Sequence, residues 1–130
     1  KWQTAEQEVV KYIPNFEVFL MGKGFYKLPT DHASEGEHKA AAEMALKKAE
    51  EIMRKVDVLI LDEVINAIGD GLIREKEVLE LIVKRKKTHL ILTGRGGSER
   101  LIERADLVTE MKKIKHPFDK GIKAVKGLDF

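Results

Sequence analysis

Apolar residues recur at helical spacing over two long segments of the chain. This spacing predicts a helix over 34–55, which starts with the capping-box pair Ser34 and Glu37. Small residues dominate the stripe of this helix that should face inward: Ala41, Ala45, Ala49, Ile52 and Met53. A second helix is predicted over 74–86, and its inward stripe is Val78, Leu79, Ile82 and Val83.

Two shorter helices are expected nearer the ends of the chain. One covers 4–13, where Thr4 and Gln7 have the spacing of a capping box. The other covers 98–105 and follows a glycine-rich turn.

Several apolar runs are short enough to be strands. VDVLIL at 56–61 and THLILT at 88–93 are nearly continuous aliphatic runs, a pattern typical of strands that are covered on both faces. Two further runs, at 16–21 and 107–114, are predicted to be strands on the same ground of length and apolar content.

Strands and helices alternate along the chain, which predicts an α/β fold with a mostly parallel sheet and helices on both of its faces. The length of 130 residues is enough for one compact domain. We therefore expect a single α/β domain over 1–130 that ends in an irregular tail over 115–130. The segment 22–36 is rich in turn-forming residues and is expected to be a loop, long enough to suggest a functional role.

Composition and charge exclude several classes of protein. Lys and Arg number 24 against 22 Asp and Glu, so the net charge of +2 lacks the basic excess of a dedicated nucleic-acid binder. No apolar run approaches the roughly 20 residues of a membrane span, and no signal peptide is visible. A charge-rich chain without cysteine fits a cytoplasmic protein.

The acidic pair Asp62 and Glu63 closes the run VDVLIL, and ligands of open parallel sheets bind at such carboxyl ends of strands. An apolar run followed by Asp-Glu is a Walker B-type pattern, in which carboxylates at a rigid strand end hold Mg²⁺ against a triphosphate. The alternative is that both residues only start a surface turn.

A glycine-rich turn, TGRGGS over 93–98, follows the second aliphatic run. Gly94 and Gly96 would let backbone N–H groups approach an anion, and a helix is expected to start at Ser98. Arg95 could hold a phosphate through two parallel hydrogen bonds. The alternative is an ordinary strand-to-helix turn with a solvated arginine.

A third feature is MGKGFY over 21–26, after the first predicted strand. Phe25 and Tyr26 beside glycines could contact a flat apolar ligand, or they could simply pack the loop onto the core. Other chemistry is not indicated, because no Ser-His-Asp arrangement or cysteine nucleophile is suggested and the histidines lack metal-ligand spacing. These histidines are His32, His38, His89 and His116.

Taken in this order, the features resemble the P-loop-type corrinoid adenosyltransferases. VDVLILDEV over 56–64 matches the Walker B strand of that family, and Gly24-Phe25 resembles a pair in its corrinoid-side loop. LILTGRGGSERLIERADLVTEM over 90–111 resembles its next strand, TGRG turn, short helix and following strand. IKHPFDKGIKAVKGLDF over 114–130 resembles its C-terminal signature, the most specific match because generic ATPases do not end this way.

The resemblance implies a P-loop NTPase-like nucleotide-binding domain that transfers the 5′-deoxyadenosyl group of ATP to the cobalt of cob(I)alamin or a related corrinoid, releasing triphosphate. Because the reduced cobalt is itself the nucleophile, no catalytic side chain is expected, only positioning and electrostatics. Asp62 and Glu63 would serve Mg²⁺ or Mn²⁺. Residues of the TGRG turn would contact the nucleotide: Gly94, Arg95 and Gly96. Residues of the loop would contact the corrinoid: Phe25 and Tyr26.

The chain departs from the family's pattern in two places. No G-x-x-x-x-G-K-[ST] loop occurs, although Lys23 lies between two glycines. Because the chain starts at Lys1 rather than Met, we expect truncation within a longer gene product, and we expect the 130 residues alone to be inactive. Two residues after the Phe, where the family carries Trp, this chain has Lys27.

The resemblance also implies partners, namely a homodimer and a flavoprotein as reductant. Two other hypotheses stay open from the sequence. One is a P-loop ATPase or kinase-like regulator that releases phosphate and binds no corrinoid. The other is a non-catalytic module that binds nucleotide or corrinoid.

Overall fold

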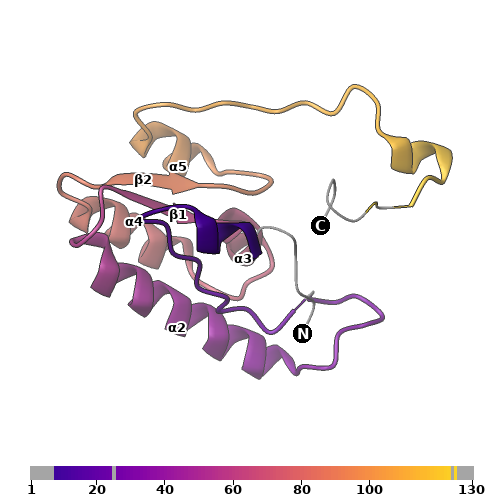
Figure 1. Ribbon diagram of the computed structural model, residues 1–130, viewed down its shortest axis with the longest axis horizontal. Coiled ribbons are helices and arrows are strands. Elements are labelled where there is room, and N and C mark those ends of the chain that lie inside the picture. Colours follow the sequence, from indigo (N-terminus) through magenta and orange to yellow (C-terminus); the bar gives the residue numbers. More distant parts are fainter. Residues whose placement is uncertain (1–7, 25, 124, 126–130) are drawn as a thin grey trace. The chain divides into compact units, whose positions relative to one another are not determined.

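The computed structural model describes residues 8–24, 26–123 and 125 (Figure 1). In chain order its elements are η1 (Val10–Tyr12), α2 (Glu35–Met53), β1 (Val58–Leu61), α3 (Val64–Gly69), α4 (Glu75–Lys84), β2 (His89–Leu92), α5 (Glu99–Arg104) and η2 (Pro117–Lys120). They fall into two compact units: Met21–Val108, and the two ends Lys1–Leu20 and Thr109–Phe130.

The larger unit is built on a two-stranded parallel sheet. β1 and β2 pair in register, from Val58 opposite His89 to Leu61 opposite Leu92. Parallel strands need a crossover connection, which α3 and α4 supply. The predicted α/β class with a parallel sheet is therefore confirmed.

The core lies between the sheet and the helices α2 and α4, which Figure 1 shows on the same side of the sheet. One apolar cluster joins these helices to β1: Ala49, Met53, Leu59 and Leu81. A second cluster draws on α3, α4 and α5: Val64, Ile73, Val78 and Leu101. Met53 and Val78 are fully buried, and removing each such side chain from water contributes about 1.5–3 kcal/mol.

Helix α2 forms as its sequence predicts. Its capping box is present, because Ser34 Oγ accepts from the Glu37 N–H at 3.3 Å and Glu37 Oε2 accepts from the Ser34 N–H at 2.8 Å. The alanine stripe is buried or half-buried throughout. After the helix ends, the buried Thr88 hydroxyl donates to the carbonyls of Met53 and Val56, which ties the end of α2 to the start of β2.

Helix α4 corrects one predicted inward position. Val83 is 72% exposed, whereas Leu81, which was not expected to face inward, is buried. The buried face is set by Val78 and Leu81, one helical turn apart, and Val83 lies beyond its edge.

The sheet has an apolar face that remains accessible. Alternate side chains point to opposite faces of a strand, and Leu59 is buried while Val58 and Ile60 are 50% and 49% exposed. On β2, Ile91 is 44% exposed. The expectation of strands covered on both faces is not confirmed by the elements that the structure describes.

Two predicted strands are wrong. The segments 16–21 and 107–114 have no strand structure. A strand exists only where a neighbour accepts and donates its backbone hydrogen bonds, and neither segment has a paired strand among the described residues. Their apolar residues are correspondingly exposed, with Leu107 at 84% and Met111 at 93%.

The unit formed by the two chain ends has little regular structure in its described residues. The predicted helix over 4–13 appears as a short turn of helix around η1, and the proposed cap residues Thr4 and Gln7 lie outside the described residues. In the predicted irregular tail, η2 is capped by the His116 ring, whose Nδ1 accepts from the Phe118 N–H at 3.1 Å.

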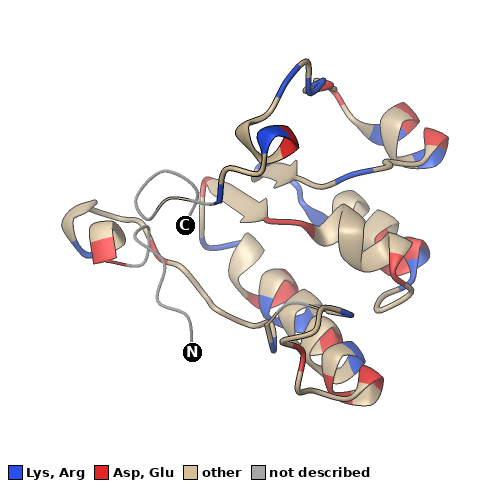
Figure 2. Ribbon diagram, turned by 90° about the vertical axis from the view of Figure 1, so that its right-hand side faces the viewer, with Lys and Arg blue, Asp and Glu red and all other residues tan. Residues whose placement is uncertain are grey.

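Charges of both signs are mixed along the helices, as Figure 2 shows, and the strands carry none. Several form exposed ion pairs, such as Lys39 with Glu35 at 2.6 Å, and such pairs add little stability because water screens their charges. Within the described ranges, every helix is too short or too polar to cross a membrane.

Candidate functional site

The predicted metal residues lie where β1 and β2 end side by side. Asp62 follows β1 directly and Thr93 follows β2, so the in-register pairing brings them together. The Thr93 hydroxyl donates to Asp62 Oδ1 at 2.7 Å and accepts from the backbone N–H of Glu63 at 2.8 Å. One side chain therefore fixes both the carboxylate of Asp62 and the backbone that carries Glu63.

Glu63 occupies an unusual backbone position. Its φ is 56°, in the left-handed region, and it is the N-cap residue of α3. This turn points the chain from the sheet edge straight into α3, which is held to β2 by the hydrogen bond from Ile65 N–H to the Thr93 carbonyl at 3.1 Å. The exposed carboxylates of Asp62 and Glu63 thus stand on a rigid strand-to-helix corner.

The TGRG turn is fastened to the same corner. Asn66 Oδ1 in α3 accepts from the backbone N–H of Arg95 at 2.7 Å. Gly94 has a φ of 138°, and a Cβ there would lie 2.7 Å from Ile65 Cβ and 2.9 Å from Asn66 Oδ1. Only glycine allows this close approach, so the turn and α3 are locked together.

The end of this turn is anchored through a serine. Ser98 caps α5, accepting from the Leu101 N–H at 3.3 Å, and its hydroxyl donates to Glu75 Oε1 at 2.5 Å. The helix start expected at Ser98 is confirmed. The backbone of Arg95 is held by its hydrogen bond to Asn66 and by the anchored Ser98 three residues later. Its side chain is exposed, so the guanidinium is accessible.

Sequence reasoning missed two residues of this site. Thr93 was predicted only as part of a strand end and of the TGRGGS turn, and no role was predicted for Asn66, yet these two residues hold the acidic pair and the TGRG turn in place. The available signal was that a polar residue follows each of two aliphatic runs predicted to lie in one parallel sheet.

The corrinoid-side loop is described in part. Phe25 lies outside the described residues. Tyr26 is half-buried, and its ring centroid lies 5.0 Å from that of His38 in α2, with the planes tilted by 60°. The Lys27 ammonium lies 4.7 Å from the Tyr26 ring centroid, a cation–π contact. Tyr26 therefore contacts α2 through the His38 ring.

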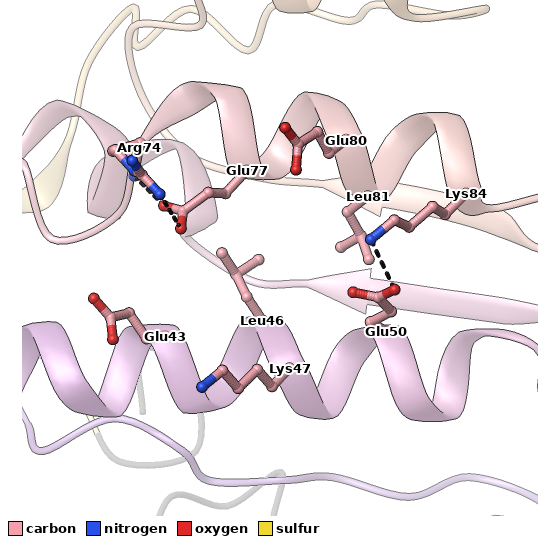
Figure 3. Close-up of a pocket in the computed structure, with 9 residues that line it drawn as sticks. All are labelled: Glu43, Leu46, Lys47, Glu50, Arg74, Glu77, Glu80, Leu81 and Lys84. Carbon is pink, nitrogen blue, oxygen red and sulfur yellow. Dashed lines mark hydrogen bonds and ion pairs between the residues drawn. The ribbon is translucent and has the colours of Figure 1, made fainter.

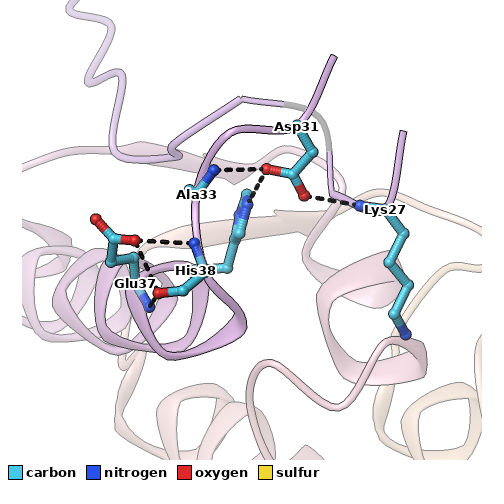
Figure 4. Close-up of polar contacts among 6 residues, drawn as sticks. Lys27, Asp31, Ala33, Glu37 and His38 are labelled. Atoms are coloured by element: carbon cyan, nitrogen blue, oxygen red, sulfur yellow. Dashed lines mark hydrogen bonds and ion pairs between the residues drawn. The ribbon is translucent and has the colours of Figure 1, made fainter. Parts of the chain in front are cut away.

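His38 is buried and bonded to Asp31 in the same loop. Its Nε2 lies 2.9 Å from Asp31 Oδ1 (Figure 4). The hydrogen bond from His38 lowers the pKa of the Asp31 carboxyl below its usual value, and backbone N–H groups of Ala33 and Lys27 act in the same direction. The histidine that appeared unremarkable in the sequence thus fixes a charged loop residue.

Two hollows lie on the larger unit. One, of about 290 Å³, lies beside the loop and is mostly apolar: Met21, Lys23, Glu37, Ala40, Ala41 and Met44. The other, of about 400 Å³, runs between α2 and α4 (Figure 3). Its lining mixes acids and bases, including the pair Lys84 and Glu50 at 2.8 Å, so it presents no charge of a single sign to a ligand.

Comparison with known proteins decides the family. The family model described as "ATP:corrinoid adenosyltransferase BtuR/CobO/CobP" matches residues 1–130. The chain belongs to this family. It is 40% identical to a corrinoid adenosyltransferase of Sinorhizobium sp. and 37% identical to one of Pseudomonas aeruginosa, in each case over 98% of the chain. An Escherichia coli corrinoid adenosyltransferase is 34% identical over 58% of the chain and 39% of its own length.

The chain covers only part of each relative's own length. The chain spans 61% of the Sinorhizobium protein and 63% of the Pseudomonas protein, about three fifths of each. Family membership confirms the resemblance drawn from the Walker B-type run, the TGRG turn and the C-terminal signature. The activity of the whole protein is a proposal.

Proposed function

We propose that the protein containing this chain transfers the 5′-deoxyadenosyl group of ATP to the cobalt of cob(I)alamin or a related corrinoid and releases triphosphate. The observation that carries the proposal is the family match over residues 1–130. The corner built from Asp62, Thr93 and the TGRG turn supports it, because it gathers polar groups suited to a nucleotide at one edge of a parallel sheet.

In the proposed reaction the reduced cobalt donates an electron pair to C5′ of ATP. The bond between C5′ and the triphosphate oxygen breaks, and its electron pair leaves with the triphosphate. The protein then has two tasks, to align the substrates and to stabilise the leaving charge. The Arg95 amide is already used by Asn66, so we assign the phosphate contact to its guanidinium and to the amides that follow Gly96.

Asp62 and Glu63 would hold Mg²⁺, or Mn²⁺, when the nucleotide is present. Among the described residues no group of three or more His, Cys, Asp or Glu side chains could cage a metal alone. That fits Mg²⁺, which keeps several waters and is bound through one or two carboxylates plus substrate phosphates. When bound, the ion would neutralise charge on the departing triphosphate.

The corrinoid is assigned to the loop with Phe25 and Tyr26. The apolar hollow beside this loop supports the assignment, since a corrin ring offers a broad apolar face. A homodimer and a flavoprotein reductant belong to the same proposal and follow from the family alone.

A P-loop NTPase-like arrangement, with helices on both faces of a larger parallel sheet, is the finer fold that we propose for the nucleotide-binding domain. The half-exposed apolar residues Val58, Ile60 and Ile91 support it. Leaving such β-branched side chains in water forgoes the stabilisation that burial provides, and a covered face would recover it.

The test is an assay of the full-length gene product with ATP, Mg²⁺ and chemically reduced cobalamin. We expect adenosylcobalamin and free triphosphate in equal amounts. Release of phosphate without an adenosylated corrinoid would instead favour an ATPase. Binding of ATP or cobalamin without any product would favour a non-catalytic module.

The metal assignment has a matched pair of variants on one strand. Asp62→Asn removes a charge at the carboxyl end of β1, and we expect turnover to fall about 100-fold or more. Asp57→Asn makes the same change next to the other end of β1 and should leave turnover within about twofold. Equal effects of the two substitutions would remove Asp62 from the metal site.

A further inference from the structure

The loop before α2 is organised around a single carboxylate (Figure 4). Asp31 Oδ1 accepts from the Ala33 N–H at 3.0 Å and lies 2.9 Å from His38 Nε2. Asp31 Oδ2 accepts from the Lys27 N–H at 2.9 Å. Both oxygens are therefore bonded, one toward the start of the turn and the other toward the helix.

The contact between the two side chains is sheltered from water. The His38 side chain is 4% exposed and the Asp31 side chain 13%. An ionised carboxylate only accepts hydrogen bonds, so His38 Nε2 carries the hydrogen in this contact. Charge-assisted bonds of this kind are roughly twice as strong as neutral ones, and removing one partner leaves the other unsatisfied.

The carboxylate also imposes a backbone shape on the loop. Lys27 has a φ of 57°, a left-handed conformation that a lysine rarely adopts without help. Its N–H is the one that Asp31 Oδ2 binds. Tyr26, the preceding residue, packs its ring against His38 with the ring planes tilted by 60°. Asp31 thus fixes the backbone that follows Tyr26, through the Lys27 N–H, and His38 contacts the Tyr26 ring.

We propose that Asp31 and His38 are positioning residues for corrinoid binding, which present Tyr26 in one fixed arrangement. The inference rests on the proposed function, because the loop is the assigned corrinoid side. The nucleotide side stands on Asp62 and Thr93 at the strand ends, and within the described ranges no hydrogen bond joins these two residues to Asp31 or His38.

This arrangement predicts a split between the two substrates. In Asp31→Asn the side chain keeps its size but loses its charge and one accepting oxygen. We expect the KM for cobalamin to rise about tenfold, the factor equivalent to about 1.4 kcal/mol, and the KM for ATP to change by less than about twofold. The matched control is Glu35→Gln, which removes an exposed acid paired with Lys39 and should change neither KM.

Histidine variants separate hydrogen bonding from packing. His38→Gln keeps an N–H near the position of Nε2, whereas His38→Leu keeps only the apolar volume. We expect the glutamine variant to lie closer to wild type in cobalamin KM. If leucine is tolerated as well as glutamine, or if both KM values rise together in Asp31→Asn, His38 and Asp31 only stabilise the fold and the proposal is wrong.

A readout that does not need turnover is trypsin cleavage after Lys27, followed by mass spectrometry. The anchored turn should resist cleavage, and Asp31→Asn should accelerate it about tenfold while Glu35→Gln does not. Absence of any adenosylated corrinoid with the wild-type protein would overturn the proposed function and the positioning role with it. Unchanged cleavage with an unchanged cobalamin KM would overturn the positioning role alone.

Discussion

Replacing Gly94 by alanine probes whether the TGRG turn depends on close contact with α3. A Cβ at this position would lie 2.7 Å from Ile65 Cβ, and 3.0 Å from the backbone nitrogen of Asn66. Backbone cannot move aside as a flexible side chain can, so α3 or the turn has to shift. The shift would strain the 2.7 Å hydrogen bond from the Arg95 N–H to Asn66.

The cost can be worked from two contributions. Forcing a methyl group into a packed contact costs about 1–3 kcal/mol. Holding a residue with a side chain at positive φ, here 138°, adds about 1–2 kcal/mol. Alanine also lowers the conformational entropy of the unfolded chain, which stabilises the folded protein by about 0.4–1 kcal/mol. The free energy of unfolding should therefore fall by about 2–4 kcal/mol in total.

Gly96→Ala is the matched control two residues away. Gly96 has a φ of 72°, but no described atom lies within 4 Å of the position of its Cβ. It should therefore carry only the conformational cost, about 1 kcal/mol. In urea unfolding, with a slope of about 2 kcal/mol per M, the two midpoints should differ by about 1 M. Equal midpoints would refute the idea that contact with α3 fixes this turn.

Two further predictions concern stability. Thr88→Val keeps the shape of a buried side chain but removes the hydroxyl that donates to the carbonyls of Met53 and Val56. The free energy of unfolding, measured in urea, should therefore fall by about 1–3 kcal/mol. Thr109 is exposed, so the control substitution Thr109→Val should change this free energy little. The pKa of Asp31 is lowered in the fold, so its contribution is fully present above the usual carboxyl pKa of 3.8 and is lost as the pH falls through the lower folded value. The difference in urea midpoint between wild type and Asp31→Asn should thus shrink as the pH falls below 3.8 through the lower folded value; a difference that persists undiminished through that range would contradict the assignment.

Elements with local signals could be predicted from the sequence. Helix α2 starts where Ser34 and Glu37 cap each other, a contact between residues three apart, so its signal is entirely local. The strands β1 and β2 were predicted because a short, nearly continuous aliphatic run is typical of a buried strand. By the same logic the runs at 16–21 and 107–114 were misjudged, since apolar content cannot supply the partner strand that pairing requires.

The candidate site was predictable only as separate pieces. Asp62 and Arg95 were named from the turns that follow aliphatic runs, but the side chains that hold them, Thr93 and Asn66, act across about 30 positions of sequence. The bond between Asp31 and His38 joins a loop to a helix face and follows no periodic rule. Both arrangements depend on tertiary packing, which local patterns do not encode.

The left-handed backbone of Glu63 makes position 63 a site where conformation and chemistry are selected together. A library of all amino acids at this position, sorted only for folded protein, should enrich glycine, asparagine and aspartate, because these tolerate positive φ. The same library sorted for turnover should retain the acids alone. Comparing the two pools would separate two effects at position 63. The left-handed backbone determines which residues allow folding, and the carboxylate determines which of them allow turnover.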